Sequence, residues 1–384
     1  MRIFLCAGEP SGDLHGANLV RHLRDLDPST ECVGFGGDNM QAAGCRLLYP
    51  LCRLAVMGIV HVLANVLSFL HLLSRADRFF RQHRPDAVVL IDYPGFNWWL
   101  ARRAHFHGIP VFYFVPPQLW GWGGYRVKKM RRWVDHVLCT LPFEKAWYQD
   151  RNVQAEYVGH PFFDELPSQR LDSSFIEMQK DGDATIVAIL PGSRTQELER
   201  NLATQIRTAR HIHQARPDTR FLVACFRSAH QQMVADYLRR HPDLPIETHV
   251  GRTPEIITLA HACVTVSGSV ALELLYRRKP SVIVYRLNKL ELNLARRVVT
   301  TKFICLVNLL AGKELYPEFA TAHCPAEAMA ERVVTWLADP PAYAALLGEL
   351  DALCARVAEP GACAKTARFI LQALADKRQP RAVA

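Results

Sequence analysis

The stretch that most constrains the fold of this chain is Ile186–Arg200, with the sequence IVAILPGSRTQELER. Five apolar residues lead into a turn of Pro, Gly, Ser and Arg, and a polar helical pattern follows. This order predicts a buried parallel strand, a tight turn and the start of a helix. Such a turn leaves backbone N–H groups free at the positive end of a helix dipole, which favours the binding of an anion.

Three residues of this turn suit a phosphate group. Gly192 allows the backbone to approach a ligand closely, Ser193 can cap the helix, and Arg194 supplies a forked donor. The alternative is an ordinary turn between a strand and a helix, with Arg194 on the surface. The turn by itself does not decide between these two interpretations.

Length and composition describe a globular protein of two or three domains. The chain has 384 residues, of which 49% are apolar and 22% charged. Its formal net charge of +9 indicates an acidic partner: a nucleic acid, an anionic lipid or a phosphorylated substrate. The eleven Cys show no CxxC pair and no metal-like spacing, and Met1 leads almost directly into a strand without a signal peptide. We therefore expect reduced, cytosolic thiols, which support neither a zinc site nor a disulfide.

The first half begins with a strand, a Gly-rich loop and a helix, the opening of a doubly wound α/β domain. The strand is Arg2–Ala7, the loop is GEPSGDLHGA, and the helix continues to about Leu26. The loop is neither GxGxxG nor a P-loop with its Lys, so neither a dinucleotide nor an ATP site is supported. Its small residues and Asp13 suit a pocket for a sugar hydroxyl, although a purely structural turn explains them too.

Another strand of the first half ends in an acid. Its residues, Asp86–Asp92, have the sequence DAVVLID. Open α/β sheets bind ligands at the carboxyl ends of their strands, so Asp92 is a candidate base or hydroxyl anchor.

Two segments of the first half suit a lipid surface. The apolar run Leu54–Leu73 is interrupted by four polar residues at helical spacing. This predicts an amphipathic helix near residues 58–81 that packs in the core or rests on a membrane without spanning it. The segment Tyr125–Trp133 (YRVKKMRRW) is basic and aromatic but contains no recognisable nucleic-acid module. Anionic headgroups, a phosphorylated lipid or a solvated helix face explain its charge.

The second half repeats the alternation of strands and helices after a polar segment, Phe163–Asp183, which we expect to be a linker. The strand Ala262–Val266 precedes Ser267–Glu273 (SGSVALE), a second turn of small residues at a helix start. A carboxylate beside phosphate-binding amides would suit a ribose diphosphate, with Glu273 on the hydroxyls. Residues 308–319 are expected to form a loop, and helices follow from about residue 325.

Motifs in order along nearly the whole chain resemble the lipid-A-disaccharide synthase family of GT-B glycosyltransferases (family 19). They are AGEPSGDLHGANL (7–19), LAVMGIVHVL (54–63), IDYPGFN (91–97), WGWGGYRVKKM (120–130), LPFEKAWY (141–148), VGHP (158–161), LPGSR (190–194), SGSVALE (267–273) and NLLAGKELYPE (308–318). The resemblance implies an α/β GT-B fold, with two Rossmann-like, doubly wound domains facing a central cleft. The expected domains are 1–168 for the acceptor and the membrane, 169–355 for the UDP-sugar, and 356–384 as a C-terminal helix packing back toward the first domain.

The resemblance also implies a reaction. The family transfers 2,3-diacylglucosamine from UDP-2,3-diacylglucosamine to the 6-hydroxyl of 2,3-diacylglucosamine 1-phosphate (lipid X), giving the β(1→6) lipid A disaccharide 1-phosphate and UDP. Inversion at the sugar, no metal and no cofactor are implied. The implied location is cytoplasmic and peripheral, on the inner face of the cytoplasmic membrane of an outer-membrane-bearing bacterium. No nucleic-acid partner is implied, and a homodimer is left open.

The residues expected to act follow from the matched motifs. UDP is expected on Gly192, Ser193, Arg194, Ser267, Gly268, Ser269, Glu273 and Asn308. The acceptor is expected near Glu9, Ser11, Gly12 and Asn97. Acyl chains and membrane are expected against Val60, Leu63, Val66, Phe69 and Leu70, and anionic groups against Arg126, Lys128 and Lys129. In catalysis, Asp92 is expected to be the base, with Asp13 as the second candidate, and Arg194 is expected to stabilise the leaving diphosphate.

Departures from the family pattern lie mostly in the acceptor half. The family's DAPDFN is Asp92–Asn97 (DYPGFN) here, so its second acid is replaced by Gly95, and the Glu of its GxVEVL segment is His61. These differences affect the acceptor and its acyl chains more than the donor. Two alternatives remain: another GT-B UDP-sugar transferase or epimerase, and a non-catalytic lipid or nucleic-acid binding module.

Overall fold

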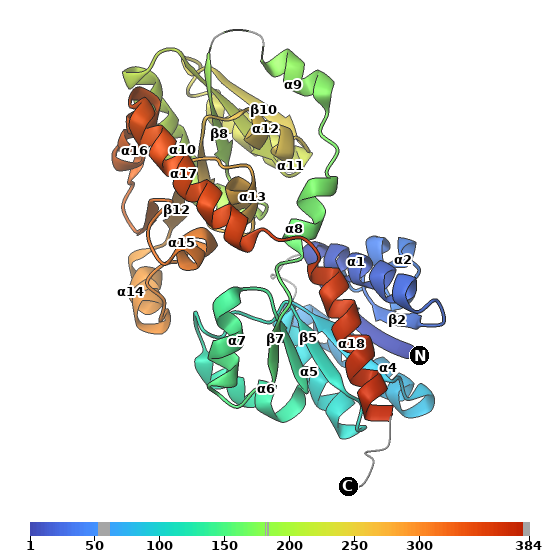
Figure 1. Cartoon of the computed structure of the whole chain (residues 1–384). Coiled ribbons are helices and arrows are strands. Elements are labelled where there is room, and N and C mark those ends of the chain that lie inside the picture. The colour runs from blue at the N-terminus through green and yellow to red at the C-terminus, as the bar shows by residue number, and fades with distance from the viewer. Residues whose placement is uncertain (53–61, 181, 183, 379–384) are drawn as a thin grey trace. The chain divides into compact units, whose positions relative to one another are not determined.

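The computed structural model describes residues 1–52, 62–180, 182 and 184–378 (Figure 1). The chain divides into two compact units, one formed by Met1–Pro167 together with Glu359–Ala384 and the other by Ser168–Ala358. The boundaries expected from the sequence were after residues 168 and 355. The chain therefore passes from one unit to the other twice, and its last helix belongs to the first unit.

The first unit contains a parallel sheet of seven strands in the order β3-β2-β1-β4-β5-β6-β7. The strands are β1 (Arg2–Ala7), β2 (Glu31–Phe35), β3 (Arg46–Tyr49), β4 (Ala87–Ile91), β5 (Val111–Phe114), β6 (His136–Cys139) and β7 (Ala155–Tyr157). All five residues of β4, AVVLI, are buried. A parallel strand that is covered on both faces requires such a continuous apolar run.

Helices cover both faces of this sheet. They are α1 (Pro10–Leu26), α2 (Asp38–Ala42), α4 (Val62–His83), α5 (Pro94–Phe106), α6 (Val127–Trp133), α7 (Pro142–Gln149), α8 (Phe162–Glu165) and α18 (Ala362–Arg378), with short 3₁₀ turns at Gly124–Arg126 and Leu166–Ser168. The final helix, α18, runs beside α1 in Figure 1. Its apolar residues Cys363, Ala367, Ile370 and Leu374 recur at helical spacing and are buried in one core cluster with residues of β1.

The second unit contains a parallel sheet of six strands in the order β10-β9-β8-β11-β12-β13. The strands are β8 (Thr185–Leu190), β9 (Thr219–Cys225), β10 (Ile246–Val250), β11 (Ala262–Val266), β12 (Ser281–Arg286) and β13 (Glu318–Thr321). The helices are α9 (Ser173–Gln179), α10 (Thr195–Ala215), α11 (Ser228–Leu238), α12 (Thr253–Leu259), α13 (Val270–Tyr276), α14 (Lys289–Val298), α15 (Leu306–Ala311), α16 (Ala326–Ala338) and α17 (Pro340–Val357). One core cluster joins the sheet to α10 and α16.

Two expectations about local structure were wrong. The segment 163–183, expected to be a linker, does contain the boundary between the two units, but it also carries most of α8 and all of α9 instead of being unstructured. Helix α9 begins after Asp172, whose carboxylate accepts the Phe175 N–H at 3.1 Å and so caps the helix. The expected loop 308–319 instead contains most of helix α15 and the first two residues of the edge strand β13, which pairs with β12.

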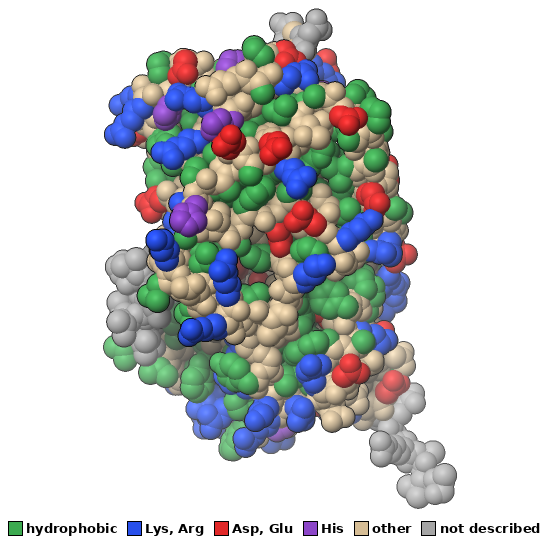
Figure 2. All heavy atoms as spheres, turned by 90° about the vertical axis from the view of Figure 1, so that its left-hand side faces the viewer, with side chains coloured by type: hydrophobic (Ala, Val, Ile, Leu, Met, Phe, Trp, Pro, Cys, Tyr) green, Lys and Arg blue, Asp and Glu red, His purple; other side chains and the backbone are tan. Residues whose placement is uncertain are grey.

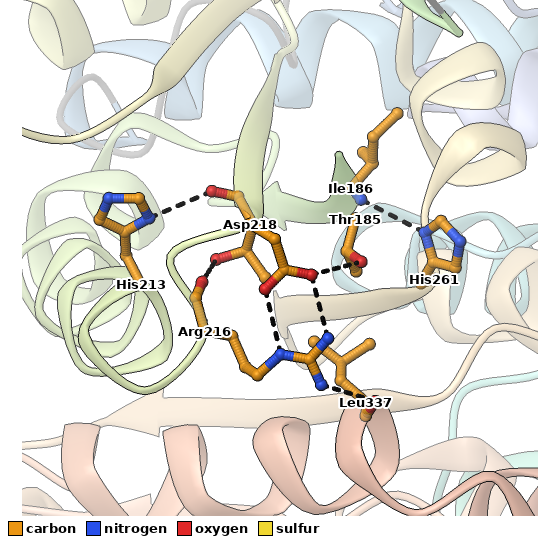
Figure 3. Close-up of polar contacts among 8 residues, drawn as sticks. Thr185, Ile186, His213, Arg216, Asp218, His261 and Leu337 are labelled. Carbon is orange, nitrogen blue, oxygen red and sulfur yellow. Dashed lines mark hydrogen bonds and ion pairs between the residues drawn. The ribbon is translucent and has the colours of Figure 1, made fainter. Parts of the chain in front are cut away.

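A polar network closes the amino-terminal edge of the second sheet (Figure 3). Arg216 binds both carboxylate oxygens of Asp218, at 3.1 and 3.0 Å, and donates to the Leu337 carbonyl at 2.9 Å. On the neighbouring strand, the Ile186 N–H donates to His261 Nδ1 at 3.2 Å. These contacts join the turn before β9 to α16, and β8 to the residue before β11, all at this edge. Open α/β sheets bind ligands at the opposite, carboxyl edge.

Candidate functional site

In each sheet there is one pair of neighbouring strands from which the chain continues in opposite directions across the sheet, and we call this place the switch point. In the first unit, β1 lies next to β4, and the chain continues from β1 toward β2 and from β4 toward β5. Ala7 and Ile91, the last residues of these two strands, are paired in register. The loops after them therefore leave the sheet side by side, at the position where open α/β sheets bind ligands.

The loop after β4 has an unusual backbone. Asp92 and Tyr93 both have φ of 47°, a left-handed conformation that costs non-glycine residues of order 1 kcal/mol or more each. Two side chains hold it: Asn97 Nδ2 donates to the Asp92 carbonyl at 2.7 Å, and the Tyr113 hydroxyl donates to the same oxygen at 2.8 Å. Asn97 is fully buried. It therefore positions the backbone at Asp92, and its expected place near the acceptor stays a prediction.

Asp92 itself is partly exposed at this switch point. Burial raises the pKa of the Tyr113 phenol, and the negative charge of the nearby Asp92 carboxylate raises it further. A partly exposed carboxylate at the end of a central strand is suitably placed to accept a proton from a sugar hydroxyl.

The glycines of the β1–α1 loop make room for close packing. A Cβ on Gly8 would lie 2.2 Å from Cδ1 of Tyr93, so the Tyr93 ring lies against the backbone there. A Cβ on Gly12 would meet Ala7 Cβ at 3.5 Å and the Ile91 carbonyl at 3.7 Å. Gly12, expected near the acceptor, is buried, whereas Glu9 is partly exposed and Ser11 is exposed.

Asp13 has a structural role, which argues against its use as the base. Its side chain is 3% exposed, and it accepts N–H bonds from Gly37, Asn39 and Met40 at 2.7, 3.0 and 3.1 Å. Both carboxylate oxygens are thus bound at the start of α2. A carboxylate used in this way holds the β2–α2 turn, and the assignment of Asp13 as the second candidate base stays a prediction.

In the second unit, the switch point lies between β8 and β11. Leu190 and Thr265 are paired near the ends of these strands, so the two turns expected to bind phosphate leave the sheet as neighbours. Gly192 has a φ of 106°, and a Cβ there would lie 3.1 Å from Val266 Cγ2. The structure thus brings together two short segments that are some seventy-five residues apart in the sequence.

The first of these turns opens the long helix α10. Its N-cap residue is Arg194, with no side-chain cap bond, so the expectation that Ser193 caps the helix was wrong. Glu197 in the first turn accepts the Arg194 N–H at 3.3 Å and its guanidinium at 2.9 Å. The Arg194 side chain is 69% exposed, and Ser193 is exposed as well. Both are therefore accessible to a ligand at the carboxyl edge.

The second turn opens α13. Ser269 is its N-cap residue, Ser267 is partly exposed, and Gly268 and Ser269 are exposed. Glu273 is 5% exposed and accepts a bond from Arg277 Nε at 2.9 Å, while burial raises the pKa of its carboxyl. Arg277 is itself fixed by Thr258 Oγ1 at 3.0 Å.

Asn308 is bonded to the backbone of its own unit. It is fully buried, its Nδ2 donates to the Tyr316 carbonyl at 2.7 Å, and its Oδ1 accepts the N–H groups of Leu315 and Tyr316 at 2.9 Å each. The Asn308 amide thus holds the chain before β13, and its expected contact with UDP stays a prediction.

The basic-aromatic segment lies after β5, the strand next to β4. The Arg126 guanidinium lies 4.0 Å from the centroid of the exposed Trp122 ring, and Lys129 Nζ lies 5.6 Å from that of Trp98. Lys128 is exposed. These contacts hold two of the three cations on aromatic faces without burying their charge.

A buried carboxylate that the sequence analysis did not single out anchors the loop before this segment. Glu144 Oε1 accepts Trp120 Nε1–H at 2.8 Å, and its Oε2 accepts the N–H groups of Thr140 and Leu141 at 2.9 Å each. Burial raises the pKa of this carboxyl. The run LPFE at the start of α7 could have indicated this role of Glu144, because a Glu three residues after a helix cap often accepts a backbone N–H of the cap.

The apolar stripe expected on the membrane is only partly described. Val60 and the side chains of Leu63 and Val66 lie outside the described residues. Phe69 packs on the core, with its ring centroid 5.5 Å from that of Phe96. Leu70 is 56% exposed. Leu67, which was not expected, is 77% exposed on the same helix.

The described residues contain no group of three or more His, Cys, Asp or Glu side chains that could hold a metal ion. None of their helices is both long enough and apolar enough to cross a membrane.

Comparison with known sequences gives one consistent result. A family model described as lipid-A-disaccharide synthetase matches residues 3–346. The lipid-A-disaccharide synthase of Anaeromyxobacter dehalogenans strain 2CP-1 is 35% identical over 370 residues, covering 96% of this chain and 97% of that protein. The synthase of Myxococcus xanthus is 34% identical and covers 98% of each chain.

Comparison with solved structures concerns the fold. A Staphylococcus aureus MnaA–UDP co-structure superposes with a TM-score of 0.67 at 12% identity, covering 100% of both chains. CalG4, the calicheamicin glycosyltransferase, superposes with a TM-score of 0.58 at 14% identity, covering 99% of both. Together with the two parallel sheets, these matches confirm the predicted GT-B fold of two Rossmann-like domains.

Proposed function

The chain belongs to the lipid-A-disaccharide synthase family, and from this premise we propose how its residues carry out the reaction. The enzyme is a glycosyltransferase that transfers 2,3-diacylglucosamine from UDP-2,3-diacylglucosamine to the 6-hydroxyl of lipid X. The products are the β(1→6) lipid A disaccharide 1-phosphate and UDP. The observation that carries the assignment of roles is the position of the switch points, because each sheet has its own and each carries residues of the chemistry required.

The second unit holds the donor nucleotide. The turns after β8 and β11 are neighbours, and their exposed residues are small, hydroxylic or basic. In the proposed complex, backbone N–H groups at Gly192, Ser193 and Gly268 bind the diphosphate, and Arg194 neutralises the charge that develops as UDP departs. Glu273 binds the ribose hydroxyls, and Ser267 and Ser269 add hydroxyl donors.

The first unit holds the acceptor. Asp92 accepts the proton of the 6-hydroxyl while that oxygen attacks the anomeric carbon from the face opposite UDP, which inverts the configuration. Asn97 and Tyr113 keep the strained backbone at Asp92 in place. Glu9 and Ser11, at the start of α1, are close enough along the same sheet edge to bind other acceptor hydroxyls.

Both substrates carry acyl chains, so the enzyme must work at a lipid surface. We place the protein on the inner face of the cytoplasmic membrane, with the α4 stripe against acyl chains and with Arg126, Lys128 and Lys129 near anionic groups. Replacing Val60, Leu63, Val66 and Leu70 of this stripe by Ser, and leaving Phe69 because it packs on the core, should weaken binding to vesicles. Unchanged vesicle binding would exclude this surface.

The decisive experiment is incubation of the purified protein with UDP-2,3-diacylglucosamine and lipid X. We expect UDP release that depends on both substrates, and a disaccharide 1-phosphate by mass spectrometry. Consumption of the UDP-sugar without lipid X would instead indicate an epimerase. Binding of lipid without any UDP release would indicate a non-catalytic module.

A further inference from the structure

Helix α14 carries an apolar stripe that the second unit leaves uncovered. Leu290, Leu294 and Val298 follow one another at four-residue intervals and so share one face of the helix. Their side chains are 79%, 62% and 42% exposed. No residue of α14 is buried. Large aliphatic side chains are usually removed from water, and a row of three on one helix indicates a surface with a partner.

The polar residues of α14 are arranged as on a helix that lies at a lipid–water interface. Lys289 and Arg297 flank the stripe on one side, and Arg296 lies beyond them on the helical wheel. All three are exposed, and none forms an ion pair with another described residue. Figure 2 faces the side on which Figure 1 draws α14, and Lys and Arg side chains are numerous on it. A surface that is both apolar and basic is complementary to anionic lipid.

The helix is anchored close to the proposed nucleotide site. It follows β12, which is next to β11, and therefore begins at the same carboxyl edge as the two phosphate turns. Glu291 on its inner side pairs with Arg200 of α10 at 3.1 Å. The Arg286 N–H, just before the helix, donates to Asn201 Oδ1 at 3.0 Å. Both anchors lie within the first two turns of α10, the helix that Arg194 opens.

We propose that α14 docks the second unit on an anionic lipid surface, with Leu290, Leu294 and Val298 inserted among the acyl chains and the three cations at the headgroups. This inference rests on the proposed function, because a donor whose sugar carries two acyl chains must be drawn from such a surface. The surface is separate from the α4 stripe, since it lies on the unit that binds UDP. Contact between α14 and the lipid keeps the turns after β8 and β11 near the plane in which the headgroup of the donor lies.

The test compares variants of the full chain in vesicle flotation. One variant replaces the stripe (Leu290→Ser, Leu294→Ser, Val298→Ser), and a second removes the charge (Lys289→Gln, Arg296→Gln, Arg297→Gln). The matched control replaces exposed apolar residues elsewhere (Leu26→Ser, Met178→Ser), at 49% and 69% exposure. Vesicles contain phosphatidylcholine with or without phosphatidylglycerol. Circular dichroism and thermal unfolding check that each variant is folded.

We expect the stripe variant to lose about tenfold or more in partitioning to anionic vesicles, and the charge variant to lose roughly a hundredfold at low salt. The control should bind as wild type does. Helix α4 is also proposed to bind lipid, so the stripe variant of α14 should still bind vesicles, but more weakly. The measured quantity is therefore the partition coefficient of each variant. Unchanged partitioning of the stripe variant would overturn the proposal. A change in oligomeric state without a change in partitioning would also overturn it, and would assign the stripe to a second copy of the chain.

Failure of this inference is distinguishable from failure of the proposed function. If the protein is not a transferase, the wild type gives no disaccharide even in detergent micelles, whatever its vesicle binding. If only the α14 inference fails, turnover and partitioning of the stripe variant both match the wild type. If it holds, the stripe variant keeps its turnover in micelles and needs more donor to reach half-maximal rate on vesicles.

Discussion

Replacing Gly192 by Ala tests the reasoning about the nucleotide site most directly. Gly192 has a φ of 106°, outside even the left-handed region that a few non-glycine residues adopt. A Cβ there would lie 2.6 Å from Glu197 Oε2, 2.9 Å from Glu197 Cβ and 3.1 Å from Val266 Cγ2. The carboxylate end can swing away, but the other two atoms belong to the first turn of α10 and to β11.

The expected loss follows from two contributions. Holding Ala at this φ costs about 1–3 kcal/mol, and relieving the overlap costs about 1–3 kcal/mol more. We therefore expect Gly192→Ala to destabilise the second unit by roughly 3 kcal/mol, which lowers its Tm by about 6–12 °C. Relief of the overlap also moves the turn away from β11, so UDP should bind at least about tenfold more weakly.

The assay is thermal unfolding with and without UDP, together with calorimetric titration of UDP. The matched control is Gly312→Ala in the same unit, where φ is 71° and a Cβ would meet no atom within 4 Å. This control should lose only about 1–2 kcal/mol and keep its affinity for UDP. Equal Tm and equal UDP affinity for the two variants would refute the claim that Gly192 is required for close approach at the switch point.

Three further predictions concern single side chains. Arg194→Ala should lower turnover roughly a hundredfold, since one positioned donor is worth about 3 kcal/mol of barrier. The unfolding free energy of this variant should change by less than about 1 kcal/mol, because the ion pair of Arg194 with Glu197 is exposed. Steady-state UDP release measures turnover, and urea titration measures stability. Full activity would remove Arg194 from the mechanism. Asp92→Asn should abolish the acidic limb of the pH–rate profile with little loss of stability. Asp13→Asn should lose stability and keep the acidic limb. The reverse pattern would make Asp13 the base. Burial lowers the pKa of His160 to about 3, and unfolding restores an ordinary value near 6.5, so the unfolded chain binds the proton first as the pH falls. Between about pH 7 and pH 5, the wild type should therefore lose about 2 kcal/mol more stability than the His160→Gln variant, as measured by urea titration at each pH. Equal losses of stability in the two proteins would show that His160 does not contribute.

The strands, and the two turns that follow β8 and β11, could be predicted because their signals are local. Ala87–Ile91 is an uninterrupted apolar run, and such a run has few alternatives to a buried parallel strand. The turn at Gly192 follows a similar run and precedes a helical pattern. Its location next to Ser267 depended only on the order of the strands, which a doubly wound sheet restricts strongly.

The roles of buried polar residues could not be predicted in the same way. Asp13 binds N–H groups that are 24 to 27 residues away, and nothing in its own neighbourhood indicates them. Asn308 matched a family motif, and that match does not distinguish a residue that contacts substrate from one that holds the backbone nearby. Edge strand β13 was missed because all four of its residues are half-buried, without the apolar run that marks the central strands.

The end of the chain has a consequence for handling this protein. Helix α18 covers a core made largely by residues from the beginning of the sequence, such as Ile3 and Leu5, and Asp164 caps its first turn through the N–H groups of Ala362 and Cys363. We therefore expect a truncation within α18 to destabilise the unit that carries Asp92 and to leave the second unit, proposed to bind the nucleotide, folded. If the second unit binds UDP as proposed, such a preparation would keep its UDP affinity, and nucleotide affinity would then be a poor criterion of intact enzyme.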